Sequence, residues 1–107
     1  MIPAALVGFW SGQVHQSSPA LQVTVDVQLV AASAAGIISY PSLNCSGNLL
    51  VVSSAGGTLT MEQQISTGKQ NCDNGVVTLT EQSNNTLVFS FKRSNGPSPT
   101  GTLTRQS

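Results

Sequence analysis

The stretch from Leu21 to Leu29 reads Leu-Gln-Val-Thr-Val-Asp-Val-Gln-Leu and alternates apolar and polar residues without a break. Successive side chains of a β-strand point to opposite faces, so this pattern separates an apolar face from a polar one. A helix would need apolar residues at intervals of three and four instead. The stretch therefore predicts a half-buried strand of an antiparallel sheet.

Similar alternation recurs between turn residues along the chain and predicts eight strands. They cover Gly8 to Gln16, Leu21 to Val30, Ile37 to Tyr40, Gly47 to Ser53, Thr58 to Ser66, Val76 to Gln82, Leu87 to Lys92 and Thr100 to Arg105. Short strands with tight turns favour an up-and-down meander, and closing them into a barrel removes the unpaired edges that promote aggregation. We expect one all-β domain over residues 1–107, an eight-stranded antiparallel up-and-down β-barrel. The alternative is a β-sandwich.

The composition argues against two classes of partner. The chain has 107 residues, a formal net charge of zero, and only 7% charged residues. Such a chain lacks the basic surface that binds nucleic acid or anionic membranes. No apolar run approaches the roughly 18 residues that a membrane-spanning helix needs. We therefore expect no nucleic-acid partner and no membrane insertion of this chain.

Two cysteines, Cys45 and Cys72, lie in turn segments rich in Gly, Asn and Ser. A meander places its first, third, fifth and seventh connections at one end, which brings both cysteines to that end. Their spacing does not match a zinc site, and a disulfide closing this loop would contribute about 3.5 kcal/mol. The predicted disulfide implies an oxidising compartment and a secreted or cell-surface protein. The alternative is a pair of buried free thiols in a reducing compartment.

The residues that usually carry catalysis are scarce. His15 is the only imidazole, and the alternation of its strand points it outward. The four acids, Asp26, Glu62, Asp73 and Glu81, belong to four different segments. An enzyme would need His15 to pair with a serine and an acid from distant strands. We expect no catalysis, no metal and no cofactor.

A small barrel can hold one compact ligand at an open mouth. The mouth predicted here is the end that carries the two cysteines. Its expected lining residues are His15, Gln16, Tyr40, Asn44, Lys69, Asn71, Asp73 and Arg93. An apolar interior with an amide-rich rim suits a small neutral molecule, a glycan or a peptide. The alternative is a protein-interaction module, such as an inhibitor of a secreted hydrolase.

The segment Gly8-Phe9-Trp10-Ser11-Gly12 resembles the Gly-x-Trp motif of the calycin barrels. In those proteins a cation from the last strand packs across the tryptophan and closes that end of the barrel. The resemblance implies that Arg105 takes this structural part against Trp10.

A longer pattern is more specific. It comprises Trp-Ser-Gly-x-Val-x-Gln (Trp10 to Gln16), Tyr-Pro-Ser-Leu-x-Cys-Ser-Gly-x-Leu (Tyr40 to Leu49), Ile-x-x-Gly-x-x-x-Cys-x-x-Gly (Ile65 to Gly75) and Gly-Thr-Leu-Thr-Arg (Gly101 to Arg105). Together these segments resemble a small secreted bacterial domain that also forms the extracellular part of membrane-anchored serine/threonine kinases. The resemblance implies a sensor or binding role. The chain departs from that family at Gln63, where a glutamate is common and which the alternation points inward.

Overall fold

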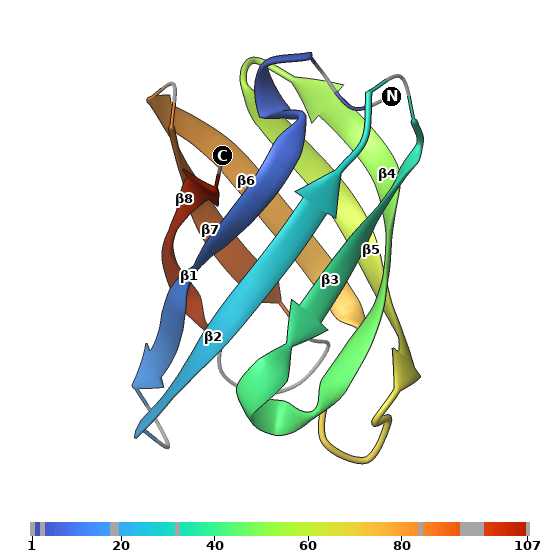
Figure 1. The fold of residues 1–107 in the computed structure, drawn as a ribbon, viewed down its shortest axis with the longest axis vertical. Helices are drawn as coiled ribbons and strands as arrows, with labels where there is room; N and C mark the ends of the chain where they lie inside the picture. The colour runs from blue at the N-terminus through green and yellow to red at the C-terminus, as the bar shows by residue number, and fades with distance from the viewer. Residues whose placement is uncertain are drawn as a thin grey trace.

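The computed structural model describes residues 2, 4–17, 20–31, 33–83, 85–92 and 98–106, which form a closed antiparallel β-barrel (Figure 1). Its strands are β1 (Gly8–Ser17), β2 (Ala20–Leu29), β3 (Ala35–Tyr40), β4 (Cys45–Ala55), β5 (Thr58–Thr67), β6 (Gly75–Ser83), β7 (Thr86–Lys92) and β8 (Thr100–Gln106). Two short 3-10 helices, η1 (Ala4–Leu6) and η2 (Pro41–Leu43), precede β1 and β4. Each strand pairs with the next, and β8 pairs with β1 to close the cylinder. The predicted barrel is confirmed, and the β-sandwich alternative is wrong.

The alternation of β2 separates the inside of the barrel from its outside as predicted. Val23, Val25, Val27 and Leu29 are buried, whereas Gln22 and Gln28 are exposed. The side chain of Leu21 lies outside the described part of the structure. The other strands also point apolar side chains into the interior, where the following are fully buried: Leu49, Leu59, Met61, Leu79, Leu87, Phe89 and Leu103. Apolar burial of this kind is the main favourable term in folding.

Both chain termini lie at one end of the barrel, which we call the closed end (Figure 1). The Trp10 ring is fully buried there, and its Nε1 donates a hydrogen bond of 3.0 Å to the carbonyl of Leu6 in η1. Leu6 and Ile2 are also buried and pack into the core cluster. The guanidinium of Arg105 lies 4.2 Å from the centre of the Trp10 ring and donates to the carbonyl of Val7. The expected contact between Trp10 and Arg105 is therefore present.

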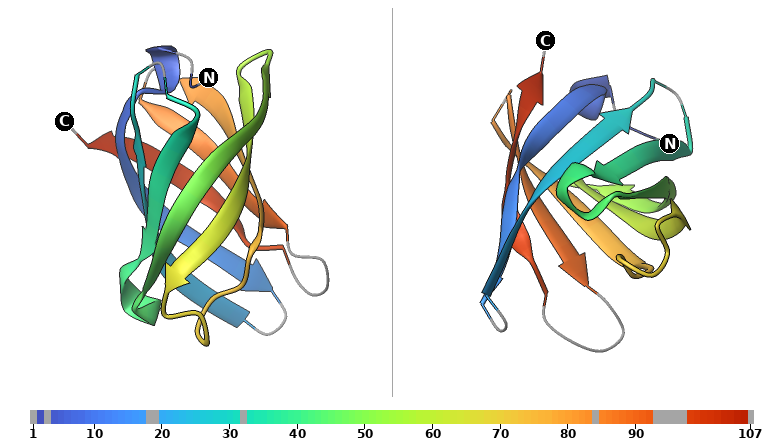
Figure 2. Two further views of the ribbon diagram at one scale, coloured as in Figure 1. Left: turned by 90° about the vertical axis from the view of Figure 1, so that its right-hand side faces the viewer. Right: turned by 60° about the horizontal axis from the view of Figure 1, so that its bottom comes forward.

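The opposite end carries the last residues of β1, β3, β5 and β7 and the first residues of β2, β4, β6 and β8, and we call it the disulfide end. Cys45 and Cys72 form the predicted disulfide, with a Cα–Cα distance of 6.3 Å. Figure 2 shows η2 beside the β5–β6 loop, and the disulfide joins this loop to the first residue of β4. One detail of the prediction is wrong, because Cys45 is the buried first residue of β4 and not a turn residue. The turn ends earlier because η2 reverses the chain within Pro41–Leu43.

Candidate functional site

A cavity of about 160 Å³ opens at the disulfide end. Its lining comes from five strands and three connecting segments and consists of Val14, Gln16, Val23, Tyr40, Leu43, Gln63, Asn71, Cys72, Asp73, Phe89, Phe91 and Pro99. Most of these side chains are apolar, and three of them are aromatic. A concave apolar site with a few converging polar groups is the usual form of a small-molecule site.

The apolar wall is built by the inward faces of the first two strands and of β7. Val14 and Val23 are direct partners across the β1–β2 pair. Phe91 is fixed at the end of β7 by its backbone N–H, which donates to the carbonyl of Pro99 at 3.0 Å. A Cβ atom at Gly75 would lie 2.7 Å from ring atoms of Phe91. A glycine at this position therefore leaves room for the ring at the wall of the cavity.

A buried amide supplies the polar part of the cavity. Gln63 is only 1% exposed and is the one buried polar residue within the described part of the chain. Its Oε1 accepts a hydrogen bond of 2.6 Å from the Tyr40 hydroxyl. Its Nε2 donates a hydrogen bond of 2.9 Å to the backbone carbonyl of Asp73. Because a carbonyl can only accept, this second bond fixes which end of the amide is nitrogen.

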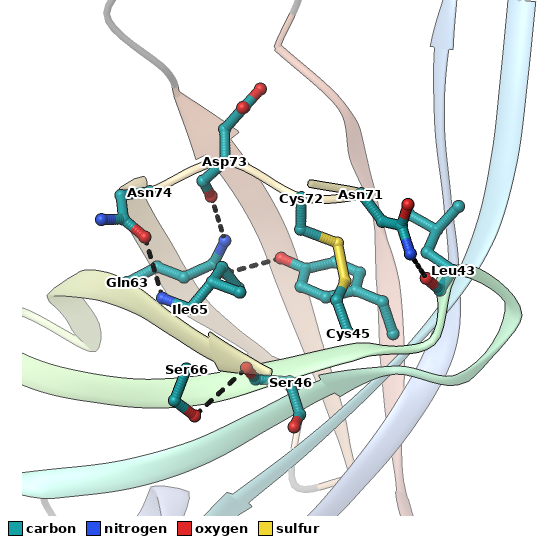
Figure 3. The surroundings of a disulfide bond; sticks show 11 residues. Leu43, Cys45, Ser46, Gln63, Ile65, Ser66, Asn71, Cys72, Asp73 and Asn74 are labelled. Carbon is teal, nitrogen blue, oxygen red and sulfur yellow. Dashed lines mark hydrogen bonds between the residues drawn. A yellow bond between two sulfur atoms is a disulfide. The ribbon is translucent and has the colours of Figure 1, made fainter. Parts of the chain in front are cut away.

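The loop that provides the Asp73 carbonyl is attached to the barrel at several points (Figure 3). The disulfide holds Cys72 against Cys45, and the Asn71 amide donates to the carbonyl of Leu43 at 2.8 Å. The Asn74 side-chain oxygen accepts from the backbone N–H of Ile65 at 2.8 Å. These bonds hold the loop at the mouth of the cavity, and none of them involves a charged side chain. We infer that the disulfide and the amides together determine the shape of this wall.

Among the described lining residues, Asp73 is the only one with an acidic or basic side chain. Asp73 is exposed, and Figure 3 shows its carboxylate pointing away from Gln63. The described residues contain no group of three or more His, Cys, Asp and Glu side chains that could hold a metal ion. The cavity therefore offers an apolar surface and neutral hydrogen-bonding groups.

Four of the eight residues expected at the mouth line the cavity, namely Gln16, Tyr40, Asn71 and Asp73. His15, Asn44 and Lys69 do not line it, and all three are exposed. Arg93 lies outside the described residues. Successive side chains alternate along β1, so His15 points outward between Val14 and Gln16.

Asn44 has a backbone role at the end of η2. Its φ of 55° lies in the left-handed region, which asparagine tolerates better than most residues, and its N–H donates to the Pro41 carbonyl at 3.3 Å. Lys69 lies in the turn of the β5–β6 loop. The structure thus assigns these two positions to loops beside the mouth and not to its lining.

Eight lining residues are absent from the expected set: Val14, Val23, Leu43, Gln63, Cys72, Phe89, Phe91 and Pro99. The alternation marks Val14, Val23, Gln63, Phe89 and Phe91 as inward-facing, and their positions near strand ends at the disulfide end are a usable signal. The expected set favoured polar loop residues, whereas inward-facing residues near the strand ends form most of the wall.

No family model matches the chain, and no curated protein matches its sequence. Among solved structures, the chain is similar to one described as a redesigned beta barrel, with a TM-score of 0.71 and 17% sequence identity. The match covers 97% of this chain and 94% of that chain. Similarity at this level of identity supports the β-barrel fold alone.

Proposed function

We propose that this protein is a non-catalytic extracellular binding module that takes a small neutral ligand into the cavity at the disulfide end. The observation that carries the proposal is the cavity of about 160 Å³ with an apolar wall and a buried amide. Buried apolar area provides most of the affinity at such a site, and the few polar groups orient the ligand. The ligand is a free small molecule, or the terminal group of a glycan or a peptide that enters from the mouth.

Among the described lining residues only Asp73 has an acidic or basic side chain, and this composition supports a neutral ligand. Transfer of an ion into an apolar site is costly unless an opposite charge or several hydrogen bonds compensate for it. Asp73 offers its backbone carbonyl to Gln63, while its own carboxylate is exposed. A neutral ligand avoids this desolvation cost.

The disulfide supports an extracellular location, because disulfides persist mainly in oxidising environments. Within the described residues, no helix is long and apolar enough to cross a membrane. The resemblance to the extracellular domain of bacterial kinases supports the same sensor or binding role.

The proposal includes no chemical step. General acid-base catalysis needs a titratable group within hydrogen-bond reach of the reacting atom. His15 is exposed and does not line the cavity, and the carboxylate of Asp73, which belongs to the lining, points away from Gln63 (Figure 3). The described lining therefore supports binding better than catalysis.

A cavity-filling substitution tests the proposal. Val23→Phe places a larger side chain in the wall, and Val52→Phe makes the same change at a position that is 63% exposed. Ligand-observed NMR with a library of small neutral compounds should find binders to the wild type and to Val52→Phe that no longer bind Val23→Phe. Circular dichroism checks that both variants are folded. Equal binding of the same compounds to a folded Val23→Phe variant would contradict the proposal.

A protein-interaction module is the second candidate, and exposed apolar side chains on neighbouring strands favour it. Ile37 on β3 and Leu50 and Val52 on the adjacent strand β4 are exposed on the outside of the barrel. Inhibition of a purified secreted hydrolase by the wild type, with loss of inhibition in Ile37→Asp, would support this candidate over the first. Tyr40 does not contribute to such a surface, because its side chain is buried.

A further inference from the structure

The hydrogen bonds of Gln63 leave part of its amide available to a ligand. A primary amide has two N–H donors and two acceptor lone pairs. The Tyr40 hydroxyl occupies one lone pair of Oε1, and the Asp73 carbonyl accepts one N–H of Nε2. One donor and one acceptor therefore remain on a side chain that lines the cavity and is held in a fixed orientation.

The size of the cavity limits what can occupy it together with this amide. A dry protein cavity of about 150 Å³ can hold benzene. The volume of about 160 Å³ found here matches one ring with a small substituent. Three aromatic residues, Tyr40, Phe89 and Phe91, contribute to the lining. Aromatic side chains favour stacked or edge-to-face contacts with a planar ring.

Resting on the proposed function, we infer that the ligand group is a neutral, single-ring compound that carries a carboxamide, a lactam or a similar donor–acceptor group. The ring occupies the apolar part of the cavity, and its polar group pairs with the remaining N–H and lone pair of Gln63. A whole oligosaccharide or a bulky peptide side chain with a charge does not meet these limits of size and polarity. The buried amide of Gln63 gives this chain a neutral recognition group.

Three compounds of nearly equal size separate the contributions of ring, hydrogen bonding and charge. Benzamide has the ring and the donor–acceptor group, toluene has the ring alone, and benzoate replaces the amide by a charged group. Calorimetric or NMR titration of the wild type should give benzamide about 10-fold tighter binding than toluene, since a buried amide group regains its hydrogen bonds. Benzoate should bind more weakly than benzamide by at least a similar factor, because of the desolvation of its charge.

Two adjacent glutamines on β5 provide a matched pair of variants. Gln63→Met keeps the length of the side chain but removes its hydrogen-bonding groups, whereas Gln64→Met makes the same change on an exposed side chain. Gln63→Met should reduce benzamide affinity about 10-fold, to the level of toluene, while toluene affinity changes little. Gln64→Met should leave all three affinities unchanged. If Gln63→Met does not fold, Tyr40→Phe removes one of the two hydrogen bonds that orient the amide and should weaken benzamide relative to toluene.

The outcomes separate the inference from the proposed function on which it rests. Equal affinities for benzamide and toluene, unchanged in Gln63→Met or Tyr40→Phe, would overturn the ligand class but leave a binding cavity. Tighter binding of benzoate than of benzamide would also overturn it. If none of the three compounds and no member of the neutral library binds the wild type, the proposed function itself fails.

Discussion

The two ends of the barrel close the same cylinder in different ways. At the closed end, the fully buried Trp10 ring, Leu6 and Ile2 fill the interior, and Arg105 lies over the indole. At the disulfide end, a covalent bond and the amide of Gln63 organise the walls, but a cavity of about 160 Å³ remains between them. The difference shows that alternation determines which side chains face inward, whereas the segments that cover each end determine whether the interior is filled: η1 packs Leu6 against Trp10 at one end, and the cavity remains beside the β5–β6 loop at the other.

The largest effect on stability is expected from removing the Trp10 ring at the closed end. Trp10→Ala removes a fully buried ring and its hydrogen bond to Leu6, and should lower the free energy of unfolding by about 4 kcal/mol. Chemical denaturation measures this change, with Trp10→Phe as a control that keeps a ring and loses less. The folded fraction should keep its ligand affinity, because the cavity lies at the other end. A loss below about 1 kcal/mol would contradict a packed closed end.

Opening the disulfide end should affect stability and binding together. The double variant Cys45→Ala/Cys72→Ala removes the link across 27 residues of sequence and should cost about 3.5 kcal/mol of stability in the chain-entropy model. It also frees the loop that holds the Asp73 carbonyl against Gln63, so ligand affinity should fall. Denaturation and ligand titration measure the two effects. Unchanged affinity in the folded double variant would show that the loop keeps its place without the disulfide.

Two glycines, one at each end of the barrel, differ in how closely other atoms pack around them. Gly68 in the β5–β6 loop has a φ of 73°, and a Cβ atom there would lie 2.3 Å from the Asn44 carbonyl oxygen. Gly56 in the β4–β5 turn has a φ of 60°, with no atom within 4 Å of its Cβ position. Gly56→Ala should cost about 1 kcal/mol from backbone strain alone. Gly68→Ala should cost about 2 kcal/mol or more, because strain and steric repulsion add. Equal unfolding free energies for the two variants would contradict the close packing of the loop.

The smallest effect on stability is expected from replacing Arg105, whose guanidinium lies over the Trp10 indole. Arg105→Met keeps much of the aliphatic stem but removes the charge over Trp10 and the hydrogen bond to the Val7 carbonyl. The free energy of unfolding should fall by about 1 kcal/mol, the size of a cation–π contact that is partly exposed. Arg105→Lys, which keeps a positive charge near the ring, should lose less. Denaturation curves of Arg105→Met that overlay the wild type would contradict a stabilising contact.

The fold could be predicted because the strands alternate inward and outward residues over most of their length, as β3 and β7 do throughout. The alternation from Leu21 to Leu29 requires one buried face, and the meander then brings both cysteines to one end. The likeness to calycins also placed Arg105 against Trp10, and the pairing of these two residues across β1 and β8 agrees with it.

The candidate site was only partly predictable, for physical reasons that differ between residues. Asn44 looks like a ligand-binding polar residue, but its amino-acid type suits the left-handed backbone at the end of η2. Phe91 lies on the predicted inward face, yet the position of its ring depends on the missing side chain of Gly75 and on the Pro99 carbonyl. Such contacts join residues far apart in the sequence, and no local pattern encodes the space that they leave.

One NMR titration tests the contrast between the filled and the hollow end most directly, because each end contains its own reporter. The side-chain amide of Gln63 reports on the cavity, and the indole N–H of Trp10 reports on the closed end. On addition of benzamide, we expect the Gln63 amide signals to shift progressively to saturation while the Trp10 indole signal stays in place. A saturable shift of the Trp10 signal with no change at Gln63 would contradict the account.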